Sequence, residues 1–209
     1  TLHLLQNEPD GPADIGLDAA TVEAKGLFSM DTTTLYGSLV RNEVHAVMEG
    51  REAHIELNGA YLLTDRSHCD NHTYIGHYVP DCTSAELYKG VLSDRSTAAF
   101  QGKIYVKQDA QNTRAYQSNA NILQSDNARV YTKPALEIYA DDVKCSHGCT
   151  VGRMDDEAIF YLRSRGVSEA EAWRMMSHAF MADVLERIEN TAWREHLGRM
   201  IDRKLAEIA

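Results

Sequence analysis

The chain lacks long hydrophobic runs, an excess of positive charge and the common nucleotide-binding motifs. No apolar stretch in its 209 residues approaches the ~20 residues of a membrane span, so we expect no membrane partner. The net charge of −10 argues against a nucleic-acid partner, because neutralising phosphates requires clustered Lys and Arg. Neither a Walker motif nor a dinucleotide-binding glycine motif is present, so nucleotide chemistry would come from a partner protein. No signal peptide is visible and the chain starts inside what reads as continuing sequence, so we expect a piece of a longer, cytoplasmic protein.

Cysteine and proline are also scarce, with four of each. The cysteines are too few and too irregularly spaced for a disulfide framework; they are Cys69, Cys82, Cys145 and Cys149. We therefore predict reduced thiols, as in a cytosolic protein.

Short, partly alternating apolar runs broken by turn residues extend from Glu23 to about Gly152 and predict an all-β region. Two architectures fit this pattern: a sandwich or barrel, and a stacked solenoid. The segment Gln111–Asn121 is rich in amides and hydroxyls, which the coils of a solenoid can align into hydrogen-bonded ladders. An exposed polar loop fits the same segment equally well, and no clean repeat period decides between the two.

The remainder of the chain has helical signals. Asp155–Glu157 favours a helix N-terminus, and Ser168 with Glu171 matches a capping box for a second helix. Thr191 can start a third helix, with apolar residues at helical spacing after it. Three short helices bury little surface, so we expect a spare apolar face that another subunit can cover.

Cys145, His147 and Cys149 alternate at the end of the β region and form the first candidate site. On a strand all three share one face, with neighbours ~6.6 Å apart and the two cysteines ~13 Å apart at the backbone. Adjacent members can chelate one ion, whereas all three need a bend, for example at Gly148. The spacing therefore indicates an incomplete site that another chain finishes. The competing interpretation is that the thiols pack in a β core and the imidazole makes an ordinary hydrogen bond.

A second cluster of possible metal ligands comprises His68, Cys69, His72 and Cys82. Its spacing fits none of the standard zinc patterns. On a strand, His68 and His72 share a face and Cys69 points away, so a polar strand face with a buried thiol explains the cluster as well. No cysteine has a recognisable base beside it in the sequence, and no Asp or Glu pair stands out as an acid and base, so enzymatic activity has little support.

Several segments together resemble the SufB/SufD family of iron–sulfur cluster assembly proteins, and its SufD members most closely. The block Thr132–Gly148, the run Thr150–Arg153 and the run Phe160–Gly166 match the C-terminal signature of these proteins. Upstream, His68–His72 and Leu87–Gly90 stand in the expected order. The resemblance covers roughly residues 42–180.

The resemblance implies a right-handed parallel β-helix (β-solenoid) over residues 1–152, truncated at its N-terminal side, and a small α-helical domain over 153–209. It implies a scaffold subunit without catalytic activity of its own, which contributes to iron entry and to nascent cluster assembly. SufB would pair with the β-helix, and the ATPase SufC would dock on the helices. His147 falls on the functional histidine of the family at the interface with SufB, and Cys145 on a neighbouring cysteine. Iron or an Fe–S cluster shared with SufB would be held transiently, and no stably bound cofactor is expected.

Cys149 departs from the family pattern, which usually has alanine there, and is either an extra thiol at the interface or a small core residue. Three alternatives remain at this point: a zinc-binding structural module built on the second cluster, a carbohydrate-active enzyme on a β-helix, and a homodimer formed in isolation.

Overall fold

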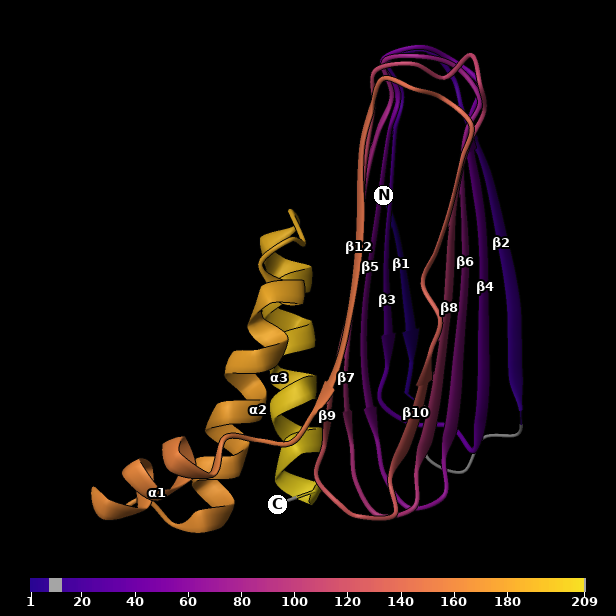
Figure 1. Ribbon diagram of the computed structural model, residues 1–209. Coiled ribbons are helices and arrows are strands. Elements are labelled where there is room, and N and C mark those ends of the chain that lie inside the picture. Colours follow the sequence, from indigo (N-terminus) through magenta and orange to yellow (C-terminus); the bar gives the residue numbers. More distant parts are fainter. Residues whose placement is uncertain (8–12, 209) are drawn as a thin grey trace.

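Strands of about ten residues, separated by tight turns, wind the chain into a parallel β-solenoid of about five turns, which three helices follow (Figure 1). The structure is a computed structural model that describes residues 1–7 and 13–208. One sheet, sheet A, has the strand order β1 (Leu2–Gln6), β3 (Leu27–Thr34), β5 (His54–Leu63), β7 (Thr83–Leu92), β9 (Thr113–Leu123) and β12 (Val143–Gly152). The facing sheet, sheet B, has the order β10 (Arg129–Thr132), β8 (Thr97–Val106), β6 (His68–His77), β4 (Leu39–Met48) and β2 (Asp14–Val22), with β11 (Ala135–Ile138) also paired to β8. The chain alternates between the two sheets, so each coil contributes one strand to each, except that β10 and β11 are two short strands of one coil in sheet B.

Residues in the left-handed region of the backbone form the corners of the solenoid. Asp65 and Asp94, with φ of 57° and 54°, occupy the corner at which the chain leaves sheet A. The opposite corner stacks Glu52, Asp81 and Asn112, with φ between 57° and 64°. Asp and Asn adopt this conformation at low cost because their short polar side chains hydrogen-bond locally.

The space between the two sheets is filled by inward-facing side chains. Large apolar residues such as Met30, Ile55 and Phe100 are at most 1% exposed and form one core cluster. Polar side chains share this interior: Gln6 Nε2 donates to Asn42 Oδ1 at 2.7 Å, and Asn42 Nδ2 donates to Asn71 Oδ1 at 2.9 Å. This amide ladder joins successive coils.

The segment Gln111–Asn121 lies mostly in β9, which confirms the solenoid interpretation of it and excludes the exposed loop. Its inward amides bond both to each other and to other residue types: Asn121 Nδ2 donates to Asn119 Oδ1 at 2.8 Å. Asn119 Nδ2 donates to the Tyr61 hydroxyl at 3.0 Å, two coils away, and Gln117 donates to Glu86.

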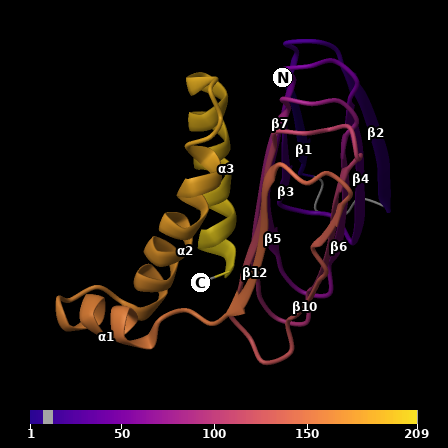
Figure 2. The ribbon, with the colours of Figure 1, turned by 45° about the horizontal axis from the view of Figure 1, so that its top comes forward.

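The three helices are α1 (Asp156–Ser164), α2 (Glu169–Leu185) and α3 (Thr191–Ile208). Two of them, α2 and α3, cover the outer face of sheet A, as Figures 1 and 2 show. A second core cluster joins outward residues of sheet A, such as Leu62 and Val91, to Met181 of α2 and Ile201 of α3. The C-terminal halves of β5 and β7 are therefore buried on both faces, which explains their near-continuous burial. In both views α1 points away from the solenoid.

The helix starts agree with the sequence. Asp155 caps α1 by accepting from the N–H groups of Glu157 and Ala158, and Ser168 caps α2 by accepting from the N–H of Glu171. β1 and β2 lie before Glu23, so the β region begins earlier than the alternating pattern predicts. Within the described residues, no helix is both long and apolar enough to cross a membrane.

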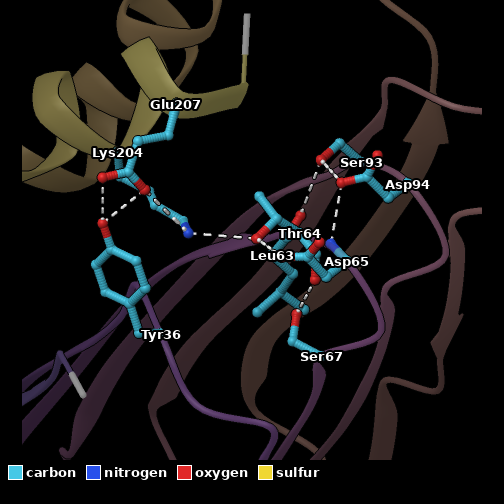
Figure 3. A network of polar contacts seen from close by, with 9 residues as sticks. All are labelled: Tyr36, Leu63, Thr64, Asp65, Ser67, Ser93, Asp94, Lys204 and Glu207. Carbon is cyan, nitrogen blue, oxygen red and sulfur yellow. Dashed lines mark hydrogen bonds and ion pairs between the residues drawn. The ribbon is translucent and has the colours of Figure 1, made fainter. Parts of the chain in front are cut away.

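Two buried lysines hold the helices against the solenoid. Lys89 of β7 forms an ion pair with Asp183, donates to the Phe180 carbonyl at 2.9 Å and lies 4.5 Å from the centroid of the Phe180 ring. Lys204 of α3 is 4% exposed and lies 3.8 Å from the centroid of the Tyr36 ring. Figure 3 shows Lys204 directed at the Thr64 hydroxyl, 3.3 Å away, on the corner next to β5.

Candidate functional site

β12 ends sheet A in the described part of the chain and carries the first candidate site. It pairs in parallel with β9 along ten residues, and the strand runs unbroken through Gly148, which pairs with Ser118. The register places Cys145 beside Ala115, His147 beside Gln117 and Cys149 beside Asn119, and these three residues of β9 all face the buried interior. Because residues in register on parallel strands point to the same face, the three candidates are directed toward the open end of the lumen.

The three candidate side chains differ in exposure. Cys145 is half-buried and packs against the interior core, and burial raises the pKa of its thiol. His147 and Cys149 are exposed, because no further coil covers β12 in the described part of the chain. The arrangement thus offers one accessible imidazole and one accessible thiol, with a less accessible thiol beside them.

Within the described residues, no group of three or more His, Cys, Asp or Glu side chains is placed to hold a metal ion. On an extended strand Cys145 and Cys149 lie too far apart to bind one ion. Imidazole and thiolate are nevertheless suitable ligands for iron and for Fe–S species. The residues therefore fit one side of a site whose other ligands come from outside this strand.

The second candidate cluster is not brought together. Cys69 and Cys82 are buried, and burial raises the pKa of both thiols, that of Cys69 to about 12. His68 and His72 lie on the outer face of β6, as the strand spacing predicts, and His72 Nε2 lies 2.9 Å from Asp70 Oδ1. The four residues thus point in different directions, and this cluster does not support a zinc module.

Two functional candidates were not found from the sequence: Glu86 on β7 and Gln117 on β9. Both are at most 3% exposed, and Gln117 Nε2 donates to Glu86 Oε2 at 2.6 Å. Burial raises the pKa of Glu86 to about 7, an effect that the hydrogen bond from Gln117 partly offsets. The available signal was a charged residue at an inward position of a strand, but recognising that position requires the strand register.

Exposed apolar side chains gather on the first two helices. Phe160 and Tyr161 of α1 are 71% and 58% exposed, and Met175 of α2 is 46% exposed. A pocket of about 630 Å³ is lined by residues of α1 that include Phe160 and Tyr161. This surface is the spare apolar face expected from the sequence.

Comparisons with known proteins point to one family. The SufBD core domain of the SUF system for FeS cluster assembly matches residues 1–180. The chain is 39% identical to the iron–sulfur cluster assembly protein SufD of Escherichia coli over 171 residues, which cover 82% of this chain and 40% of that protein. It is 31% identical to the chloroplastic protein ABCI7 of Arabidopsis thaliana over 192 residues, covering 91% of this chain and 40% of that protein. The chain thus spans about 40% of the length of these relatives.

Proposed function

Because the chain belongs to the SufBD core family of the SUF system and is SufD-like, we propose that it is the scaffold subunit of an iron–sulfur cluster assembly complex. In this proposal the open end of the solenoid pairs with SufB, the helices dock the ATPase SufC, and the subunit contributes to iron entry without catalysing a reaction alone. Iron or the nascent cluster is the cargo of the complex and is shared with SufB.

The observation that carries the proposal is the placement of His147. Its imidazole is exposed on a strand that, among the described residues, pairs on one edge only, and its register directs it toward the open end of the lumen. An unpaired strand edge of ten residues is a template for another chain. A partner that adds its own strand there would bring its ligands next to His147, and Cys145 lies two residues away to support them.

The test is anaerobic cluster reconstitution by the complex with SufB and SufC, measured by the absorbance of the assembled cluster. We expect His147→Ala to abolish or strongly reduce cluster formation. Ser146→Ala is the matched control, because Ser146 is exposed on the opposite face of the same strand and its replacement should leave cluster formation unchanged. Normal cluster formation by His147→Ala would refute the role of this residue.

The exposed surface of α1 supports the contact with the ATPase. Aromatic side chains on a protruding helix are typical of the core of a protein–protein interface. A chain that ends near Arg153 should lose SufC binding in a pull-down assay, and Phe160→Ser should weaken it while leaving the circular dichroism spectrum unchanged. Full binding by the shortened chain would contradict this assignment.

A further inference from the structure

Glu86, Gln117 and His147 occupy equivalent positions on three successive coils. The register pairs Glu86 with Gln117 and Gln117 with His147, and neighbouring strands lie about 4.8 Å apart. All three side chains belong to the inward-facing set of sheet A. A column therefore runs from a buried carboxyl group, through a buried amide, to the exposed imidazole at the open end.

The amide of Gln117 has a defined polarity. Its Nε2 donates to Glu86, and an ionised carboxylate can only accept hydrogen bonds, so the NH₂ side of the amide is fixed toward Glu86. Gly102 on the facing sheet leaves space for the Gln117 side chain, since a Cβ at this position would lie 2.2 Å from Gln117 Nε2.

The other side of the amide lacks a partner. Gln117 is 3% exposed, and its Oε1 accepts no hydrogen bond within the described part of the chain. A buried carbonyl oxygen left without a donor is costly. The next residue in the column, one coil further toward the open end, is His147, whose ring always carries at least one N–H.

We propose that His147 donates a ring N–H to Gln117 Oε1, so that Glu86 and Gln117 together fix the tautomer and orientation of the imidazole. The other ring nitrogen then keeps its lone pair and faces outward, where it can ligate iron. Glu86 and Gln117 act as positioning residues, in the way that carbonyl or carboxylate partners orient metal-binding histidines. This inference rests on the proposed function, because it names the residues that prepare the same imidazole.

The tautomer of His147 can be measured by the ¹⁵N chemical shifts of its ring in the full chain labelled with ¹⁵N-histidine, without metal. The measurement belongs near pH 8, where Glu86 is mostly ionised because its pKa is about 7. In the wild type we expect one tautomer to dominate. Gln117→Leu removes the acceptor for the His147 N–H. Glu86→Gln keeps the shape of the side chain, but its amide can donate as well as accept, so it no longer fixes which side of the Gln117 amide faces it. Each variant should lower the tautomer ratio about fivefold to tenfold, the effect of one ordinary hydrogen bond.

Ser118→Ala is the matched control, because Ser118 neighbours Gln117 but is exposed on the outer face, and it should leave the ratio unchanged. An unchanged ratio in either folded variant overturns the proposal, and Glu86→Gln keeps the test available if Gln117→Leu fails to fold. The failure of this proposal can be distinguished from the failure of the proposed function. If His147→Ala abolishes cluster formation but Gln117→Leu leaves the tautomer ratio unchanged, only the positioning role of Glu86 and Gln117 is wrong. If the ratio responds but His147→Ala assembles clusters normally, the column exists and the assembly role is wrong.

Discussion

The buried carboxyl group of Glu86 should make the stability of the protein depend on pH in a specific direction. Burial raises its pKa from 4.5 in the unfolded chain to about 7 in the folded protein. Below about pH 4.5 both states carry the proton, and Glu86 contributes no difference. Between about pH 4.5 and pH 7 the unfolded state releases its proton first, so the folded state loses stability as the pH rises. Above pH 7 both states are ionised and the loss is complete.

The difference between the two pKa values corresponds to about 3 kcal/mol, since each tenfold change in proton affinity is worth about 1.4 kcal/mol. Glu86→Gln is neutral at every pH and can still accept from Gln117 Nε2 through its own carbonyl oxygen. The free energy of unfolding of the wild type relative to Glu86→Gln should therefore fall by up to about 3 kcal/mol between about pH 4.5 and pH 8.

The assay is urea denaturation followed by far-ultraviolet circular dichroism at a series of pH values, for both proteins. Comparing the two removes the contribution of every other titrating group. Glu137→Gln is a control of opposite sign in a different pH window, because the hydrogen bond from Lys103 lowers the pKa of Glu137 below its usual 4.5: the wild type should gain stability over this variant as the pH rises to about 4.5, and the difference should stay constant at higher pH. A constant difference between wild type and Glu86→Gln across the range would refute the assignment of Glu86 as a buried proton-binding group.

Three further predictions concern packing, the helix contact and the thiols. Gly59→Ala should destabilise the fold by roughly 1–3 kcal/mol in thermal unfolding, because the new Cβ would lie 2.1 Å from the Tyr88 ring on the next coil. Gly16→Ala is the control and should destabilise the fold far less, because a Cβ there has no neighbouring atom within 4 Å. Lys89→Met should increase hydrogen exchange in α2, since it removes an ion pair and a hydrogen bond to that helix; unchanged exchange would show that the apolar contacts suffice. In the folded protein Cys149 should react with iodoacetamide much faster than Cys69, as measured by mass spectrometry. The reason is that Cys149 is exposed, whereas burial raises the pKa of the Cys69 thiol to about 12; equal rates would contradict the burial of Cys69.

Much of the secondary structure can be predicted from local sequence. Alternation of apolar and polar residues marks the strands, and the caps at Asp155 and Ser168 mark the helix starts, because each of these signals depends on neighbours within a few residues. The alternation also predicts correctly that His68 and His72 share a strand face and that Cys69 lies on the other. Alternation cannot say what covers each face, so it leaves both a sandwich and a solenoid open, and it is the resemblance to the SufB/SufD family that implies the solenoid.

Local sequence therefore predicts the helices, most of the strands after Glu23 and, through the resemblance to a family, His147 as a candidate site residue. Which residues lie beneath His147 depends on how the coils stack. The spacing between stacked positions changes along the solenoid, from 29 residues between His54 and Thr83 to 31 between Glu86 and Gln117, so no single period in the sequence aligns the columns. Hydrogen bonding between whole coils sets that register, and it places a buried carboxyl group and a buried amide in line with the imidazole at the open end.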